Sequence, residues 1–360
     1  MLSNNKEIMK KLINKLRRKK PQEPHARITN ETIAEHRERI LAGGRRFKYP
    51  VQYARHRLVI SAISIAVAAL LLLIGLIYYQ LYRAQSSNDF MYRVTRVLPL
   101  PVASIDGQPV LYGDYLMKYR SSVHYLQEKE QVSLKTDDGK RQSDRIKQEA
   151  MADAVADAYA IKLAGEKDIT VTDSELQLFL QQQRESADGA VSSATYHAVI
   201  LDYYGWSADE YEHATYNKLL RQKVSYAVDD TAKKLADTVA SQTRAANADL
   251  KTIADTVGGA KNASIIYGVS GMVPKVNQDG GLAKKAATLK VGEVSDVIRS
   301  TTGDGYYIIK LVETNDTQVS YQYIHVLLTT FDSQLADLKK SDATFKEYIA
   351  VPKVDETTTK

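Results

Sequence analysis

The chain has no cysteine at any of its 360 positions. Disulfides, thiolate zinc sites and thiol catalysis are therefore excluded, and the hydrophobic core alone must hold any exported domain together. An exported domain without disulfides fits the outer face of a bacterial plasma membrane better than an oxidising eukaryotic lumen.

Motifs for metal binding and for common catalytic chemistries are also missing. None of the four histidines after residue 58, His124, His197, His213 and His325, lies in an HExxH pattern. No P-loop, dinucleotide fingerprint or Ser/His/Asp arrangement is present. We therefore expect neither a metal nor a cofactor.

Charge is missing from one long stretch. Residues 58–82 are 25 consecutive positions without a charged side chain. About 20 apolar residues suffice to cross the hydrocarbon core as a helix, and the stretch is longer than the apolar part of a cleavable signal peptide. Tyr78, Tyr79 and Tyr82 lie where an aromatic belt is expected. The stretch predicts a single transmembrane helix, and it indicates an anchor because no charged or polar residue within it implies transport.

The charges on the two sides of this segment have opposite sign. Residues 1–57 hold 16 Lys and Arg against 5 Glu, a net charge of +11. Because the whole chain is +6, the part after the segment is net −5. The positive-inside rule places the basic arm in the cytoplasm, where it attracts anionic lipid. We therefore expect lipid contacts through the arm and residues 58–82, and no nucleic acid partner.

The region beyond the span begins with strands and continues with helices. Residues 102–106 and 108–110 predict a strand pair, and helices are expected from about 112 to 130 and around 146–161. Thr172-x-x-Glu175 and Ser207-x-x-Glu210 are capping boxes that open two further helices. Helices are then expected at 231–244 and 248–257, strands at 264–269, 293–298, 306–312 and 319–328, and a helix at 332–349. This order predicts an α+β fold.

Three segments of the first half resemble the SurA/PrsA-type extracytoplasmic foldases. They are VASIDGQPVLYGDYLMKY from residue 102, AGEKDITVTDSELQLFLQQQ at the end of a long helix, and GWSADEYEHATYNKLLRQKV from residue 205. The resemblance implies a mainly helical chaperone domain that forms a cradle for unfolded or newly translocated polypeptides.

The second half resembles a parvulin-type (PpiC-type) peptidyl-prolyl isomerase domain, an α/β domain with a small, mostly antiparallel sheet. The matching segments are GMVP from Gly271, TLKVGEVS from Thr288 and DGYYIIKL from Asp304. Proline isomerisation requires an apolar pocket that favours the twisted amide, but neither a nucleophile nor a cofactor.

Both histidine positions of active parvulins are substituted here. The family places one histidine on its first strand and one on its last, facing each other under the bound proline. Tyr307 occupies the last-strand position, and the segment VSYAV at 224–228, expected as the first strand, has Ala227 or a neighbour there. His325, in YQYIHVLL, resembles the first-strand histidine, as though a second copy of the domain began at Val319. The pocket candidates that the resemblance implies are Met272, Val276, Thr301 and Tyr307, with His325 as a further candidate and no catalytic residue assigned.

Aromatic residues gather in the chaperone-like half and suit partly wet contacts with a client. Packing of their own domain is the alternative role for each of them. The client-binding candidates are Tyr203, Tyr204, Trp206 and Tyr211.

The sequence therefore predicts a membrane-anchored folding factor, single-pass in a bacterial plasma membrane, with its N-terminus in the cytoplasm. It would hold unfolded polypeptides, with isomerase activity reduced or lost. The alternatives are an active isomerase and a non-enzymatic envelope adaptor or signalling protein. The expected domains are a basic arm (1–57), the span (58–82), a linker (83–98), a chaperone domain (99–226), a parvulin-like domain (227–314), and a C-terminal strand and helix (315–360) that closes the fold or is a partial second repeat.

Overall fold

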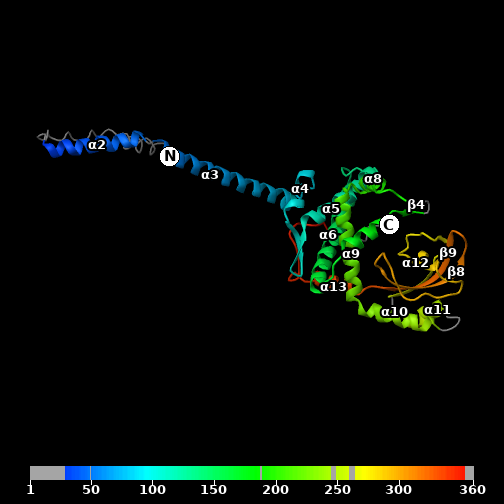
Figure 1. Cartoon of the computed structure of the whole chain (residues 1–360). Coiled ribbons are helices and arrows are strands. Elements are labelled where there is room, and N and C mark those ends of the chain that lie inside the picture. Colours follow the sequence, from blue (N-terminus) through cyan, green and yellow to red (C-terminus); the bar gives the residue numbers. More distant parts are fainter. Residues whose placement is uncertain (1–28, 49, 187–188, 245–248, 259–263, 353–360) are drawn as a thin grey trace. The chain divides into compact units, whose positions relative to one another are not determined.

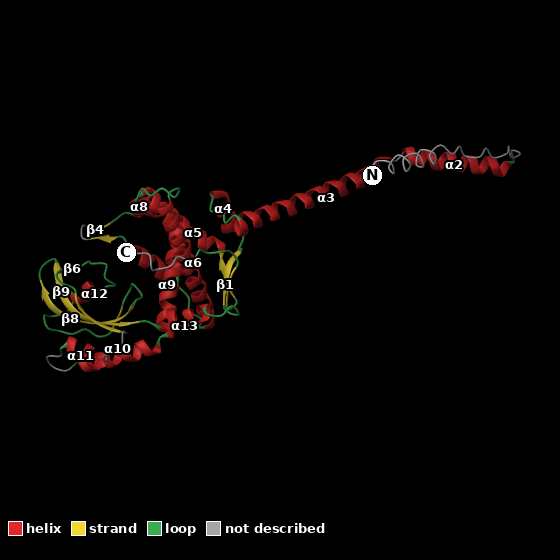
Figure 2. Cartoon of the chain, turned by 180° about the vertical axis from the view of Figure 1, so that it is seen from behind, coloured by secondary structure: helices red, strands yellow, loops and turns green. Residues whose placement is uncertain are grey.

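A computed structural model of the chain describes residues 29–48, 50–186, 189–244, 249–258 and 264–352. Ile8, Leu12 and Leu16, at fourfold spacing among basic residues, predict an amphipathic helix over residues 1–20, and this segment lies outside the described ranges. The chain divides into two units, Met1–Gly75 and Leu76–Lys360. The α+β class predicted from the sequence is confirmed (Figure 2).

The first unit is built from helices. The sequence predicts a short helix over residues 30–41 ended by Gly43-Gly44, but helix α2 (Asn30–Lys48) continues through this glycine pair. Helix α3 (Pro50–Tyr78) carries the uncharged segment (Figure 1). Over His56–Arg83 the helix has the length and mean hydropathy, 2.8, of a membrane span, and its most apolar window is not buried by other parts of the chain.

The second unit starts with the last residues of α3 and a π-helical turn, η1 (Tyr79–Arg83). Leu81 in this turn is completely buried among core residues that include Val102 and Tyr112. Helix α4 (Asp89–Val97) follows, in the region predicted as a linker, and buries Met91 in the same core. The folded domain therefore begins inside the end of the long helix, and the expected 83–98 linker is replaced by a docked helix.

We call residues 76–228 together with 329–352 the helical part. Its strands form a small antiparallel sheet in the order β10-β1-β2, and its helices pack around the core that contains Leu81. Both predicted capping boxes are formed, at Thr172 and Ser207. The elements are β1 (Pro101–Ile105), β2 (Gln108–Leu111), α5 (Tyr112–Glu128), α6 (Asp137–Glu166), α7 (Asp173–Gln182), β3 (Glu185–Ser186), β4 (Gly189–Ala190), α8 (Ser193–Tyr204), α9 (Ala208–Val228), α13 (Thr330–Lys339) and β10 (Phe345–Glu347).

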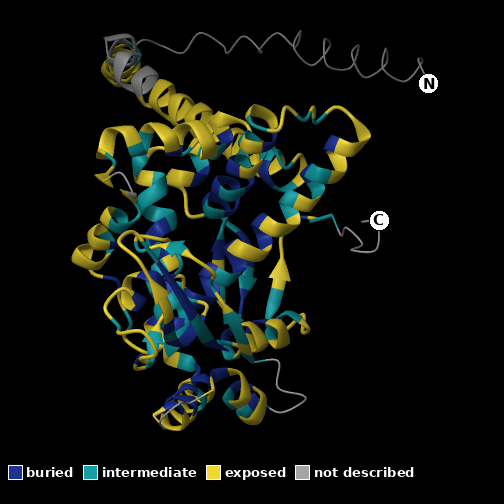
Figure 3. Ribbon diagram, turned by 90° about the vertical axis from the view of Figure 1, so that its right-hand side faces the viewer, coloured by how far each residue is buried: buried dark blue, intermediate teal, exposed yellow. Residues whose placement is uncertain are grey.

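Residues 229–328 form the sheet part. Its antiparallel strands run in the order β5-β9-β8-β7, and β6 also pairs with β9. Helices α10 and α11 cover one face of the sheet and α12 covers the other (Figures 1 and 2). Figure 3 shows buried residues along the inner sides of these strands and helices. The elements are α10 (Asp230–Thr243), α11 (Leu250–Gly258), β5 (Ile265–Val269), β6 (Val273–Pro274), α12 (Leu282–Ala286), β7 (Ile298–Arg299), β8 (Gly305–Thr314) and β9 (Gln318–Leu327).

Two segments differ from the sequence-based expectation in ways that affect the site. Residues 224–228, expected as the first strand of the parvulin-like domain, are the last turns of α9. The inner position of the sheet, between β5 and β8, is instead taken by β9 from the C-terminal side. Residues 340–349, expected as helix, contain β10, which pairs with β1 in the helical part.

Candidate functional site

The two faces of the main sheet have different surroundings because neighbouring residues of a strand point to opposite sides. On β8, Tyr306 and Ile308 pack against α10 and α11, whereas Tyr307 and Ile309 lie on the face that carries α12. His325 is the cross-strand partner of Tyr307 and lies on this second face. We call this face the α12 face.

Tyr307 and His325 form a stacked pair on the α12 face. Their ring centroids are 4.1 Å apart and their planes are 9° from parallel. Both side chains are mostly buried, and Ile266 on β5 is the partner of His325 on its other side. Gly305 makes the approach possible, because a Cβ there would be 2.1 Å from the carbonyl oxygen of Val326 and 2.8 Å from His325 Nε2.

Asp304 accepts hydrogen bonds from both members of the stacked pair. The Tyr307 hydroxyl donates to Asp304 Oδ2 at 2.7 Å, and the Thr302 hydroxyl donates to Oδ1 at 2.7 Å. His325 Nε2 is 3.2 Å from the backbone carbonyl oxygen of Asp304, so this nitrogen carries the proton. Its distance to Asp304 Oδ2 is 3.8 Å. Asp304 therefore orients both rings, Tyr307 through its carboxylate and His325 through its backbone carbonyl.

The pKa values of these groups follow from burial and from the hydrogen bonds. Burial lowers the pKa of His325 below its usual value, although the Asp304 carboxylate opposes this. Burial acts to raise the pKa of Asp304, but hydrogen bonds from Thr302 and Tyr307 outweigh it, and the pKa lies below its usual value. Burial and the bond to Asp304 raise the pKa of Tyr307. At neutral pH the pair is an uncharged imidazole on an uncharged phenol.

Two further tyrosines extend the aromatic surface along β9. Tyr323 lies 5.8 Å from Tyr307 and 6.3 Å from Tyr321, measured between ring centroids. The Tyr321 hydroxyl donates to Asp279 Oδ2 at 2.6 Å, whereas that of Tyr323 has no hydrogen-bond partner among the described residues. The α12 face thus carries a cluster of aromatic rings whose polar atoms are mostly occupied, and Tyr307, Tyr321 and His325 within it are buried.

The other predicted pocket residues lie on loops. Met272 and Val276 flank β6, and both side chains are exposed. Thr301 is exposed, and its backbone N–H donates to the carbonyl oxygen of Gly280. Among the predicted candidates, the structure brings Tyr307 and His325 into direct contact. No contact of Met272, Val276 or Thr301 with this pair is seen among the described residues.

The client-binding candidates of the helical part lie along α8 and the start of α9. Tyr204 stacks on Trp206 with centroids 5.2 Å apart, and Trp206 lies 6.5 Å from Tyr211. Tyr211 shares a hydroxyl–hydroxyl bond with Tyr196, and burial raises its pKa. Tyr203 faces elsewhere, toward Tyr125 and under the Lys129 ammonium. Trp206 and Tyr211 are therefore part of the packing, while Tyr203 and Tyr204 stay about half exposed.

An open groove of about 850 Å³ lies beside Tyr203 and Tyr204. Tyr125, Leu126 and Ile146 from α5 and α6 form its apolar wall. Its polar lining comes from Ser121, Ser122, Glu130, Gln142 and Arg145. An aromatic and aliphatic wall with a polar rim suits reversible contact with an extended, partly apolar peptide.

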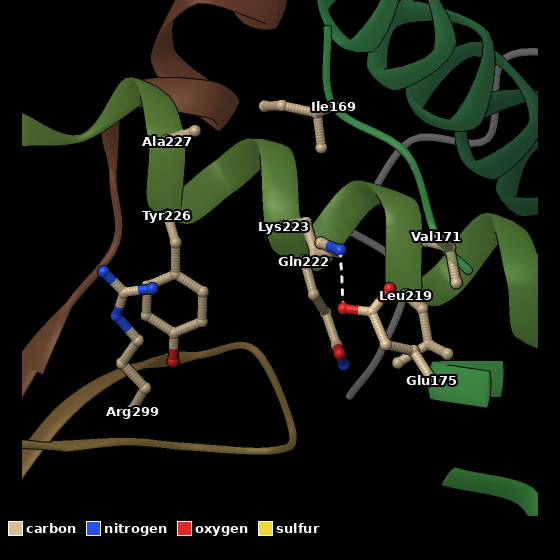
Figure 4. Close-up of a pocket in the computed structure, with 9 residues that line it drawn as sticks. All are labelled: Ile169, Val171, Glu175, Leu219, Gln222, Lys223, Tyr226, Ala227 and Arg299. Atoms are coloured by element: carbon tan, nitrogen blue, oxygen red, sulfur yellow. Dashed lines mark hydrogen bonds and ion pairs between the residues drawn. The ribbon is translucent and has the colours of Figure 1, made fainter. Parts of the chain in front are cut away.

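A second hollow, of about 420 Å³, lies where α9 meets the sheet part (Figure 4). Lys223 reaches Glu175 at 2.7 Å and also donates to the carbonyl oxygen of Thr170. At the other end Arg299 lies over the ring of Tyr226. The Tyr226 hydroxyl donates to the carbonyl oxygens of Ser300 and Gly305, so a residue expected in the first strand joins α9 to the sheet part.

Sequence reasoning missed Asp304, Tyr226 and Tyr323 as parts of these sites. Asp304 lies three residues before Tyr307 in the DGYYIIKL segment, so its position in the sequence could have indicated that it belongs to the site. The role of Tyr226 had no such signal, because its segment was expected to be a strand. Among the described residues, no group of three or more His, Asp and Glu side chains is placed to hold a metal ion.

Comparison with protein-family models gives two matches. A SurA-like N-terminal domain matches residues 52–225, and a PPIC-type PPIase domain matches residues 219–313. The chain therefore belongs to the SurA/PrsA-type foldases, as its sequence motifs predict. The second match includes β8 with Tyr307 but ends before β9 with His325. A comparison with curated proteins finds no match.

Proposed function

We propose that the protein is a membrane-anchored foldase that holds unfolded, newly translocated polypeptides outside the plasma membrane. The uncharged segment 58–82 supports the anchor, and the +11 charge of the arm before it supports a cytoplasmic N-terminus. The observation that carries the holding function is the groove beside Tyr203 and Tyr204, on a domain of the SurA-like type.

The groove is suited to weak and repeated binding. Tyr203 and Tyr125 lie 6.4 Å apart with both rings about half exposed, so their apolar surface is available without unfolding. Arg145 and Glu130 at the rim accept peptides of either charge. Tyrosine supplies contact area with little loss of side-chain entropy, which favours binding of many sequences at moderate affinity.

The holding function is tested by suppression of client aggregation. The full chain in lipid nanodiscs is mixed with a chemically unfolded client, and light scattering is followed after dilution. Tyr125→Ser combined with Tyr203→Ser should raise the protein concentration needed for half-suppression by about tenfold, or 1.4 kcal/mol. Tyr348→Ser is the matched control, because Tyr348 is equally exposed but follows directly after β10 and does not line the groove. Equal suppression by all variants would contradict the groove.

Isomerase activity is a second candidate function, favoured by the pairing of Tyr307 with His325. The family's two facing histidines have a counterpart here in one histidine and one tyrosine on neighbouring strands, in register and in contact. The stacked Tyr307 and His325 rings are uncharged, and both donate hydrogen bonds to Asp304. They therefore form an apolar surface against which a twisted prolyl amide can be favoured over the planar form.

A proline-limited refolding assay tests this second function. We expect the full chain to accelerate the slow phase, and the double substitution Tyr307→Phe with His325→Gln to remove most of the acceleration. Tyr267→Phe is the control, since Tyr267 lies on β5 but packs on the opposite face of the sheet. Absence of acceleration at micromolar protein would exclude this function and leave the holding function intact. If both assays fail, the adaptor alternative is favoured.

A further inference from the structure

The end of the long apolar helix is part of the folded foldase domain. Leu81 is completely buried, and its carbonyl oxygen accepts a hydrogen bond from the Tyr112 hydroxyl at 2.7 Å. The Tyr82 hydroxyl donates to the carbonyl oxygen of Pro101 at 2.7 Å. Tyr78 and Tyr79, one turn earlier, are exposed. The last residues of the proposed span are therefore part of the folded domain.

Helix α4 is fixed close to this junction. Arg83 and Asp89 are six residues apart, so at most about 20 Å of chain separates the end of η1 from the start of α4. Asn88 caps α4 by accepting from the N–H of Met91 at 2.8 Å. Figure 1 shows α4 beside the point at which α3 enters the domain.

The inner side of α4 is held by specific contacts. Met91 and Thr95 are buried, and Gly113 allows the approach, because a Cβ there would be 2.9 Å from the carbonyl oxygen of Thr95. The Tyr92 hydroxyl bonds to Glu210 on α9, and the Arg120 guanidinium lies over the Tyr92 ring. These contacts fix one side of α4 against the domain and leave the opposite side exposed.

The free side of α4 is apolar and basic. Phe90, Arg93 and Val97 follow one another at helical spacing, and Phe90 and Val97 are 62% and 80% exposed. Arg96 flanks this stripe, and Leu98 extends it beyond the helix. The acidic residue of the first turn, Asp89, is paired with Arg120, and the Glu210 carboxylate on the inner side bonds to Tyr92 and lies near Arg96, so two arginines face one remaining carboxylate.

We infer that this side of α4 is a docking surface for the outer leaflet of the membrane, with phospholipid of net negative charge as its partner. Phe90, Val97 and Leu98 enter the boundary between headgroups and acyl chains, and Arg93 and Arg96 bind lipid phosphates. A helix with an apolar stripe and flanking arginines has the composition of helices that lie in this interface. The short connection to η1 places it where the proposed span leaves the bilayer.

This inference rests on the membrane anchoring proposed above, and the experiment separates the two. Because the chain has no cysteine, single cysteines can be introduced and spin-labelled without other changes. The variants are Phe90→Cys and Val97→Cys on α4, Leu72→Cys within the span, and Leu201→Cys on α8 as an exposed apolar control. Each full-length protein is placed in nanodiscs containing phosphatidylglycerol, and label accessibility to oxygen and to a water-soluble nickel complex is measured.

The expected result is high oxygen and low nickel accessibility at positions 72, 90 and 97, and the reverse at 201. Replacing phosphatidylglycerol with phosphatidylcholine, or adding Arg93→Gln and Arg96→Gln, should shift positions 90 and 97 toward nickel accessibility and leave 72 unchanged. If 72 is in lipid while 90 and 97 are in water, the α4 surface is wrong and the anchor stands. If 72 is in water, the anchor itself is wrong.

Discussion

Tyr307 on β8 and His325 on β9 are direct cross-strand partners, and both rings hydrogen-bond to Asp304, the tyrosine hydroxyl to its carboxylate and the histidine Nε2 to its backbone carbonyl oxygen. The histidine comes from a strand that follows the last strand of the matched isomerase region in the chain. The two facing rings thus come from strands on either side of the end of that matched region. This arrangement leads to the first two predictions.

Tyr307→Phe should lower the free energy of unfolding of the sheet part by about 1 to 2 kcal/mol, because a buried bond to a charged acceptor is lost. The pKa of Asp304 should rise at the same time, since the Tyr307 hydroxyl is one of the groups that lower it. Tyr323→Phe is the matched control, because the Tyr323 hydroxyl has no protein partner among the described residues. Denaturant unfolding of the full chain measures the free energy of unfolding of both variants. Equal losses in the two variants would show that the Asp304 bond contributes nothing.

Acidification should destabilise the sheet part through His325. Burial holds the pKa of this histidine below its unfolded value of about 6.5, so the unfolded chain binds the proton more readily. The contribution of neutral His325 to stability is therefore complete above about pH 6.5 and decreases as the pH falls below that value. The Asp304 carboxylate opposes the loss but does not cancel it, and its own protonation acts only at lower pH.

The measurement is the thermal unfolding midpoint of the sheet part between pH 7.5 and 5. His325→Gln should flatten the decrease, because glutamine fits a similar polar role without a titrating group. His197→Gln is the control, since His197 is a histidine of the helical part, on α8, and lies outside the sheet part. A wild-type midpoint that stays constant over this range would contradict the assignment.

Local signals in the sequence predicted much of the helical part, and non-local pairing limited the rest. The capping boxes at Thr172 and Ser207 are short-range hydrogen-bond patterns, and both helices start where they predict. Helix α8 was missed because its residues are rich in aromatic and β-branched side chains, leaving only the Ser192 cap and Gly205 as signals. The strand at 319–328 and its histidine were predicted, but the position of β9 between β5 and β8 depends on pairings that no local pattern encodes.

The error at residues 224–228 has a comparable cause. VSYAV is a run of β-branched, aromatic and small residues that fits a strand, yet it continues the periodicity of the preceding helix. Val224 is buried in the core of the helical part, and Tyr226 reaches the sheet part. Packing of the long helix therefore decides the structure of a segment whose intrinsic preference is ambiguous.

Asp229→Ala should loosen the connection between the two parts. Asp229 is buried where α9 meets α10, and it accepts from the N–H groups of Ala232, Thr329 and Thr330, at 2.9, 2.7 and 3.0 Å. The chain passes between the helical and sheet parts twice, near residues 229 and 329, and Asp229 connects these two segments. Loss of a helix cap and of acceptors for buried amides should cost about 3 kcal/mol. Limited proteolysis near residues 229 and 329 reports the opening, and Asp230→Ala, one residue along and exposed, should leave cleavage unchanged.

Leu81→Ala tests whether the end of the apolar helix belongs to the foldase core. Leu81 is completely buried, so truncation should destabilise the helical part by about 3 kcal/mol through lost contacts and a cavity. Leu72→Ala is the control, because Leu72 is 72% exposed on α3 and contacts no core. Denaturant unfolding of the full chain in nanodiscs, followed by the fluorescence of Trp206 in the helical part, measures both variants. A flexible linker between span and domain would make the two substitutions equivalent, whereas a shared core makes only Leu81→Ala shift the transition.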